Sequence, residues 1–152
     1  MEKWEITGGL LKRIGDFNVN SWNDRVVAQK LVYLIQYGLG DDLKYPFNLY
    51  VHGPYSPQLA NDLYKLGDTE KVTTVKYKSE EMDEKFKKFV QLLGDKKKNT
   101  NCLELVATMI YIHRTQKVDE SQILEKVKRL KPHFHQKDYL SAFNIFTRIS
   151  KI

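Results

Sequence analysis

The chain has 152 residues, of which 41% are hydrophobic and 12% aromatic, and it carries a formal net charge of +6. This length is typical of one domain, and the apolar content excludes wholesale disorder. No run approaches the roughly 18 apolar residues that cross a bilayer, and Met1 to Trp4 lack the apolar segment of a signal peptide. The lone cysteine, Cys102, excludes an internal disulfide and fits a reducing compartment. We therefore expect a cytoplasmic protein without a membrane partner.

The positive charge is concentrated in the second half of the chain. Residues 1–75 contain 8 Lys or Arg and 9 Asp or Glu, whereas residues 76–152 contain 17 basic and 10 acidic side chains. A nucleic-acid partner would therefore be sought in the second half. The alternative is that these lysines only solvate the surfaces of helices.

The first two predicted helices cover residues 2–15 and 22–37. In the first, apolar side chains recur near the helical spacing, although Gly8-Gly9 costs about 1 kcal/mol per glycine in a helix interior. Ser21 is the expected N-cap of the second. Its buried face is predicted to be one apolar stripe: Val27, Leu31, Leu34 and Ile35.

A strand, a turn and a helix are predicted next. The segment 47–52 is rich in Phe, Leu, Tyr and Val, which favours a strand, and Gly53-Pro54 indicates a turn. Ser56 is the expected N-cap of a helix over 57–66, because a proline at the first helical position loses no hydrogen bond. The Val, Thr and Tyr residues of 72–77 predict a second strand.

The rest of the chain is predicted to be helical. Asn101 with Glu104 resembles a capping box, and Asp119 is the expected cap of the following helix. Leu130 and Leu140 are among the side chains expected to point inward. The four expected helices cover residues 81–94, 102–114, 120–130 and 137–150.

These elements predict a mainly α fold (α+β), with six to seven helices and two short strands. Residues 1–78 hold both strands and are expected to be winged-helix-like, and residues 79–152 form a basic helical half. The lysine-rich segment 95–99 between two helical patterns is too short for a domain boundary. A single compact domain over residues 1–152 is therefore expected.

No constellation of catalytic or metal-binding residues is visible. His133 and His135 flank a phenylalanine, but side chains two apart do not share a helix face, and further ligands at a recognised spacing are missing. Cys102 lies at the start of a predicted helix, where the helix dipole would lower its pKa, yet no nucleophile signature surrounds it. Neither a phosphate-binding loop nor a Gly-x-Ser-x-Gly elbow is present. We expect no catalytic residues, no cofactor, no metal and no enzymatic activity.

The most distinctive stretch is the corner where the predicted strand turns into the helix. One interpretation is a pocket for a ligand or a peptide, framed by a helix N-terminus, which suits an anion. The alternative is that the turn merely joins two elements and that its aromatic side chains pack. The candidate residues of this corner are Tyr50, His52, Gly53, Pro54, Tyr55 and Ser56.

Several segments around the corner resemble the YwgA-type family of small prokaryotic proteins and, more distantly, the Panacea-domain proteins. The most characteristic element is His52 to Ser56. The resemblance implies a mainly helical, winged-helix-like domain with no established reaction, related to antitoxins and SocA-like protease adaptors. The matching segments are residues 29–35, 45–50, 52–56, 59–63, 103–108 and 130–134.

Two functional hypotheses remain open. The first is a protein-interaction or regulatory module, antitoxin-like or adaptor-like, whose partner is another protein; a homodimer is compatible with it. The alternative is a winged-helix DNA-binding regulator. The predicted helix 57–66 carries one Lys and one Asp, so it would supply little of the affinity for phosphates. Contacts to a nucleic-acid backbone would come instead from Lys76, Lys78, Lys85, Lys87, Lys88, Lys126, Lys128, Arg129 and Lys131.

Overall fold

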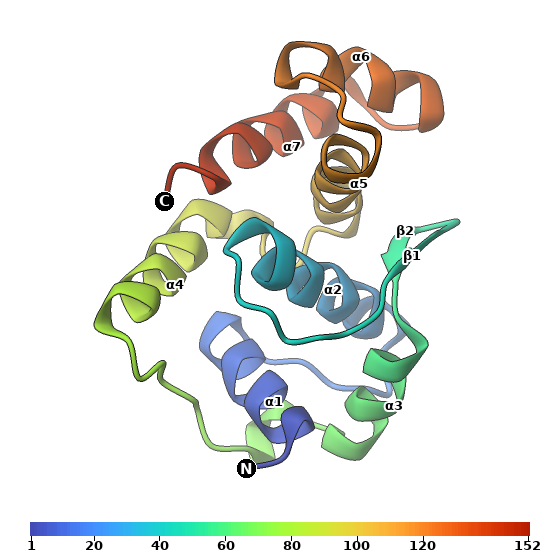
Figure 1. Ribbon diagram of the computed structural model, residues 1–152. Helices are drawn as coiled ribbons and strands as arrows, with labels where there is room; N and C mark the ends of the chain where they lie inside the picture. The colour runs from blue at the N-terminus through green and yellow to red at the C-terminus, as the bar shows by residue number, and fades with distance from the viewer.

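The computed structural model describes residues 1–152 and contains seven α-helices and one two-stranded antiparallel sheet (Figure 1). The strands β1 (Asn48–Tyr50) and β2 (Gly53–Tyr55) form a hairpin. The predicted mainly helical fold with a small β component is confirmed. The helices are α1 (Lys3–Ile14), α2 (Trp22–Tyr33), α3 (Pro57–Leu66), α4 (Glu80–Leu93), α5 (Thr100–Gln116), α6 (Glu120–Leu130) and α7 (Gln136–Ile149).

Helices α2 and α5 form the centre of the molecule. Val27 to Tyr33 on α2 and Cys102 to Ile110 on α5 are buried on all sides, as expected for helices with neighbours all round. Helices α6 and α7 pack on α5, and α1 and α3 pack beside α2 (Figure 1). One core cluster of 36 buried residues extends through both halves of the chain.

Helix α2 begins where its cap predicts. The Ser21 side chain accepts a hydrogen bond from the Asp24 N–H at 3.2 Å. The helix then continues into a π-helical turn, Leu34–Gly38, in which the Leu39 N–H donates to the Leu34 carbonyl. The helical extent predicted from the sequence is therefore confirmed, with a widened last turn.

The second predicted strand, residues 72–77, is wrong. This segment is extended chain outside any sheet, and its Val75 N–H donates to the Gly9 carbonyl of α1 at 3.4 Å. Gly9 permits the close approach, because a Cβ at that position would lie 2.3 Å from Cγ2 of Val75. The apolar residues that suggested a strand pack instead against the core. The only sheet of the structure therefore consists of β1 and β2.

The strand that pairs with β1 was predicted as a turn. Tyr50 lies opposite Gly53 and Leu49 opposite Pro54, so the turn consists of Val51 and the following His52. Proline has no N–H to donate, which confines it to strand positions where no ladder bond is needed. Gly53 has φ +91°, a conformation that glycine adopts without the steric cost of a Cβ.

Two further local predictions fail at helix boundaries and faces. Asn99, not Asn101, caps α5 by accepting from the Cys102 N–H at 2.9 Å. Asp119 does occupy the predicted N-cap position of α6, but its side chain makes no cap hydrogen bond. Leu130 and Leu140 are half exposed. Each lies beside the buried stripe of its helix and not within it: α6 buries Ile123 and Val127, and α7 buries Tyr139, Ala142, Ile145, Phe146 and Ile149.

Candidate functional site

The corner between the hairpin and α3 is fixed to the central helix α2. Gln29 on α2 is 2% exposed, and its side-chain amide donates to the Ser56 carbonyl and accepts from the Ser56 N–H, both at 2.9 Å. The Ser56 hydroxyl accepts from the Leu59 N–H at 3.3 Å, which confirms its predicted role as N-cap of α3. A buried Gln is stable here because all three of these polar groups are paired.

A buried lysine holds the second strand of the hairpin. Lys30 is 1% exposed and its ammonium donates to the Pro54 carbonyl at 2.6 Å. Burial lowers the pKa of Lys30 to about 8; the carboxylate of Glu104 opposes this shift and the cation of Lys131 adds to it. A lysine with so little contact with water must be matched by nearby acceptors, and Glu104 supplies the nearby charge.

Glu104 on α5 joins the hairpin to the segment after α6. Its Oε2 is 3.0 Å from Nζ of Lys131, and its Oε1 is 3.4 Å from Nδ1 of His52. The Lys131 ammonium also donates to the Val51 carbonyl at the hairpin turn, at 2.5 Å. Gly53 lies against the same group of residues, since a Cβ there would be 3.2 Å from Oγ1 of Thr108. The hairpin is thus attached at Val51 in its turn, at Pro54 within β2 and at Ser56 directly after β2.

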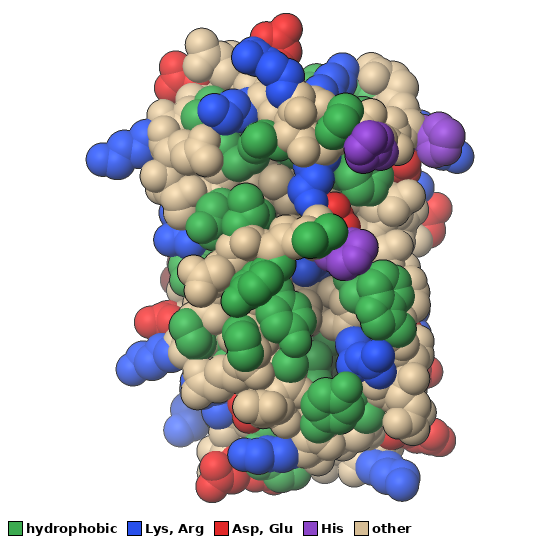
Figure 2. All heavy atoms as spheres, turned by 90° about the vertical axis from the view of Figure 1, so that its right-hand side faces the viewer, with side chains coloured by type: hydrophobic (Ala, Val, Ile, Leu, Met, Phe, Trp, Pro, Cys, Tyr) green, Lys and Arg blue, Asp and Glu red, His purple; other side chains and the backbone are tan.

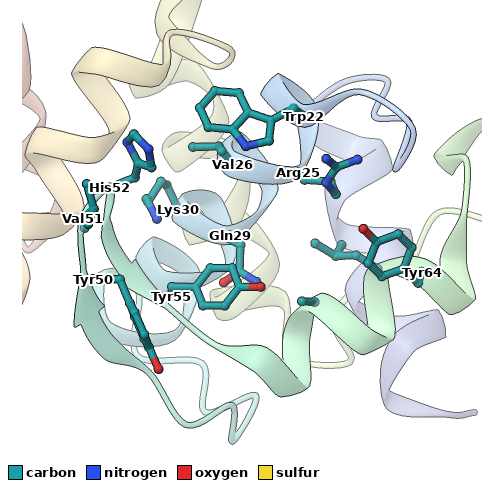
Figure 3. A pocket seen from close by; sticks show the side chains of 13 residues that line it. Trp22, Arg25, Val26, Gln29, Lys30, Tyr50, Val51, His52, Tyr55 and Tyr64 are labelled. Atoms are coloured by element: carbon teal, nitrogen blue, oxygen red, sulfur yellow. The ribbon is translucent and has the colours of Figure 1, made fainter.

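A pocket of about 340 Å³ opens between the hairpin, α2 and α3 (Figure 3). Its walls include four large aromatic side chains, and two of them, Tyr50 and Tyr55, meet edge to face with ring centres 5.4 Å apart. On the α2 side, Trp22 meets the ring of His52, also at 5.4 Å. The pocket is lined by Trp22, Arg25, Val26, Gln29, Lys30, Tyr50, Val51, His52, Gly53, Tyr55, Ala60, Leu63 and Tyr64.

The rim of this pocket exposes an unusual amount of apolar surface. Trp22 is 56% exposed, Tyr50 50%, Val51 81% and Tyr64 62%. Figure 2 shows hydrophobic side chains gathered on this face of the molecule. Large contiguous apolar patches on a protein surface often mark sites of interaction with a protein or a ligand. We call Trp22, Tyr50, Val51, Tyr55 and Tyr64 the corner surface.

Apart from its tyrosines, the ionisable side chains of the pocket are all basic. Arg25, Lys30 and His52 line it, and no Asp or Glu does. Arg25 donates through one guanidinium nitrogen to the Val19 carbonyl at 2.5 Å and forms no salt bridge. In Figure 3 its guanidinium lies between the rings of Trp22 and Tyr64.

The structure separates the six predicted corner residues into two groups. Tyr50, His52, Gly53 and Tyr55 line the pocket, whereas Pro54 and Ser56 are buried beneath it and are not part of its lining. The pocket lies along the side of α3, at Ala60, Leu63 and Tyr64, and the predicted frame of a helix N-terminus does not form it.

Nine of the thirteen pocket residues were missed by the sequence analysis: Trp22, Arg25, Val26, Gln29, Lys30, Val51, Ala60, Leu63 and Tyr64. Gln29 and Lys30 do carry a signal, because two polar residues stand within the apolar stripe of α2. Glu104, inside the buried run of α5, carries the same signal. Trp22 and Tyr64 lie on the outer faces of their helices, and only the folded chain brings them together.

The predicted nucleic-acid contacts do not form one surface. Lys76 and Lys78 precede α4, which carries Lys85, Lys87 and Lys88; Lys126, Lys128 and Arg129 lie on α6. Figure 1 places α4 and α6 on different sides of the molecule, with α7 between them.

Several of these cations already interact with other groups of the protein. Lys87 is 3.2 Å from Oε1 of Glu84, and Lys128 lies over the ring of Tyr139. Lys131 belongs to the hairpin anchor described above and points into the corner.

Two residues that were considered as a nucleophile or a metal ligand, Cys102 and His135, serve the fold instead. Cys102 is fully buried, and burial raises the pKa of its thiol to about 11, so the expected lowering by the helix dipole is wrong. His135 occupies the N-cap position of α7, and its main-chain N–H donates to the Asp138 carboxylate at 3.3 Å. No three or more His, Cys, Asp or Glu side chains are grouped so that they could hold a metal ion. None of the helices has the length and apolar character needed to cross a membrane.

Comparisons of the chain with models of protein families, with curated proteins and with solved structures give no match. The chemistry of the corner surface is therefore the basis for assigning a function. That surface surrounds a pocket with exposed aromatic side chains from the hairpin, α2 and α3, and the pocket contains an arginine that forms no salt bridge.

Proposed function

We propose that this chain is a non-enzymatic binding module that regulates or adapts another protein by docking it at the corner surface. The observation that carries the proposal is the exposure of Trp22, Tyr50, Val51 and Tyr64 around one pocket. Trp, Tyr and Arg are the side chains that most often dominate the binding energy of protein interfaces. Arg25 completes that composition here.

The rigidity of the corner supports binding. Gln29 and Lys30 hold the main chain of Ser56 and Pro54, and Lys131 holds the hairpin turn. A surface that keeps its shape before the partner arrives loses less conformational entropy on binding. The exposed aromatic groups of the corner surface are therefore presented in a preorganised arrangement.

The polar groups near the pocket also favour binding over catalysis. The Gln29 amide and the Lys30 ammonium each have a main-chain partner, and His52 is paired with Glu104. A general acid or base needs reach to a substrate proton, and a nucleophile needs an adjacent base to activate it. These side chains instead fix the fold of the hairpin.

The resemblance to antitoxin and adaptor families supports the same function, because proteins of both kinds act by binding other proteins. The DNA-binding alternative rests on the basic residues of the second half. Their division between α4 and α6, and the engagement of Lys131 in the corner, give it less support. A phosphate-tracking surface needs its cations side by side along one face.

Site-specific photo-crosslinking tests the proposal. A benzophenone side chain is placed at Tyr64 on the corner surface and, as a matched control, at exposed Lys88 on α4, which lies on the opposite side of the molecule in Figure 1. We expect irradiation of cells that express the protein to give a discrete protein adduct at Tyr64 and none at Lys88. The partner in the adduct is then identified and purified by itself, and its binding to the wild-type and Tyr64→Ser chains is measured. Adducts with nucleic acid alone, or equal adducts at both positions, would overturn the proposal.

A further inference from the structure

We propose that the corner surface selects an acidic partner segment that inserts one large apolar side chain into the pocket. Arg25 binds a carboxylate of that segment. This inference rests on the proposed function and adds the chemistry of the partner. Three features of the corner carry it: the size of the pocket, the sign of its charges and the free hydrogen-bonding capacity of one side chain.

The size of the pocket limits what enters it. About 340 Å³ lies at the lower end of the roughly 300–1,000 Å³ typical of binding pockets. The walls are Trp22, Val26 and Leu63 together with the two hairpin tyrosines. A space of this size and character accommodates a large apolar side chain, while the backbone that carries it stays outside, against the exposed rim of Tyr50 and Tyr64.

The charges of the corner favour a negative partner. The pocket lining contains Arg25, Lys30 and His52 and no acidic residue. Glu104, which lies behind His52, is already bound by Lys131. Arg25 is therefore a permanent cation of the pocket, and no carboxylate lies beside it in the lining. Complementary charge raises the rate of encounter and the specificity of an interface.

Two other carboxylates near the corner are also engaged elsewhere. Asp24 on α2 accepts from the Asn18 N–H at 3.0 Å and lies 3.5 Å from Nζ of Lys98. Asp62 on α3 accepts from the Tyr45 hydroxyl at 2.7 Å. Neither of them forms a salt bridge with Arg25, and neither lines the pocket.

Arg25 is the cation that can touch a partner. Lys30 is 1% exposed and bound to Pro54, so it contributes charge but no contact. Arg25 uses one nitrogen for Val19, and its guanidinium lies at the mouth of the pocket between two aromatic rings (Figure 3). A guanidinium binds carboxylates through paired hydrogen bonds and stacks on aromatic faces. An Asp or Glu next to the inserted side chain would meet it there.

A peptide segment fits these features better than a nucleic acid. Nucleic-acid backbones are bound by rows of cations that neutralise successive phosphates. The pocket mouth offers one accessible arginine among apolar groups, which suits a single carboxylate beside an apolar anchor. The partner class is therefore an acidic protein segment.

Selection from random-sequence peptides displayed on phage tests this inference without knowledge of the natural partner. The baits are the full wild-type chain, Arg25→Glu, Arg25→Gln and, as a matched charge reversal away from the corner, Lys88→Glu. A Trp22→Ser/Tyr64→Ser double variant removes peptides that bind elsewhere. Circular dichroism and urea unfolding confirm that each bait is folded.

We expect the wild-type and Lys88→Glu baits to enrich peptides in which Asp or Glu adjoins a large apolar residue. Synthetic versions of these peptides should shift the fluorescence of Trp22 and bind Arg25→Gln about tenfold more weakly. Arg25→Glu should enrich Lys or Arg beside the same apolar residue. Enrichment of apolar residues without acidic neighbours would overturn the charge selection and leave the proposed function standing. Enrichment no greater than that of the double variant would overturn both. Enrichment of acidic peptides without an apolar anchor would show that binding is non-specific electrostatic attraction, and it would overturn the inference.

Discussion

The side-chain amide of Gln29 forms two hydrogen bonds with the main chain of Ser56, one as donor and one as acceptor, each 2.9 Å long. Both residues are almost fully buried. The pair links the centre of α2 to the first turn of α3, and it fixes the angle at which α3 leaves the hairpin. The position of Tyr64, on the far side of the pocket from the hairpin, depends on that angle.

Replacing Gln29 by alanine should destabilise the chain by about 2–4 kcal/mol, because it leaves the Ser56 N–H and carbonyl buried without partners. Urea unfolding followed by circular dichroism measures this loss. Gln29→Glu is the matched control: its carboxylate still accepts from the Ser56 N–H but faces the Ser56 carbonyl, so its cost should remain large. A loss below about 0.5 kcal/mol in the alanine variant, the range of ordinary surface substitutions, would contradict this role.

Lys30 makes stability depend on pH in a defined window. Its pKa is about 8 in the folded chain and 10.5 as an ordinary value. Between these limits the unfolded chain holds the proton and the folded chain does not, so the free energy of unfolding rises with pH. Below about pH 8 both states are protonated, and the full cost of burying the charge, roughly 3 kcal/mol at most, is present.

Comparison with Lys30→Met isolates this contribution. The wild type should gain stability relative to the variant as pH rises from 8 towards 10.5. Tyrosine ionisation also affects alkaline stability, since burial raises the pKa of Tyr33 to about 12 and raises those of Tyr45 and Tyr77. These tyrosines are common to both chains and cancel in the difference. A difference that stays constant over the window would show that the folded-state pKa of Lys30 is not lowered.

Gly53 has two independent reasons to be glycine, and a pair of variants separates them. Its φ is +91°, and an added Cβ would lie 3.2 Å from Thr108 Oγ1 and 3.4 Å from Glu104 Cγ. Gly40 has a similar φ of +82° but open space around it. Gly40→Ala should cost about 1 kcal/mol from backbone strain alone, and Gly53→Ala should cost roughly 1–2 kcal/mol more from crowding. Equal losses of stability in the two variants, measured by thermal or urea unfolding, would mean that α5 shifts to make room for the added methyl group.

Local signals predicted most of the helices because each depends on its own sequence. Ser21 and Ser56 cap helices through residues three positions away, and the apolar spacing of α4 or α7 is set within one helix. The hairpin was harder to predict. Gly53-Pro54 has the composition of a turn, and it forms a strand because Lys30 and the packing of α5 hold β2 in place.

The candidate site was predicted only on its hairpin side. His52, Tyr50 and Tyr55 belong to one short segment, so the sequence shows them together. Trp22, Arg25 and Tyr64 come from two other helices, and no local pattern relates them to the hairpin. The strand predicted over residues 72–77 is wrong because local composition was misleading there. Its residues favour a strand, but the segment packs against α1 at Gly9 and pairs with no other strand.

Lys131 distinguishes the two functional candidates, because each assigns it a different role. Its ammonium lies 3.0 Å from Glu104 and donates to the Val51 carbonyl, whereas Lys88 on α4 forms no salt bridge. Lys131→Met should therefore lower the free energy of unfolding by about 1–3 kcal/mol, since it leaves the largely buried Glu104 carboxylate with only His52 within salt-bridge distance. Lys88→Met should change it by less than about 0.5 kcal/mol.

Mobility-shift titrations of the same two variants with duplex DNA at several salt concentrations complete the comparison. A lysine that neutralises a phosphate contributes about 0.9 to the slope of log affinity against log salt concentration. We expect Lys131→Met to leave that slope unchanged, because its ammonium is already bound within the protein, and we expect any DNA binding by the wild type to vanish at moderate salt. A slope that falls equally in both variants, with stability unaffected by Lys131→Met, would instead assign Lys131 to a nucleic-acid surface and weaken its role in supporting the hairpin.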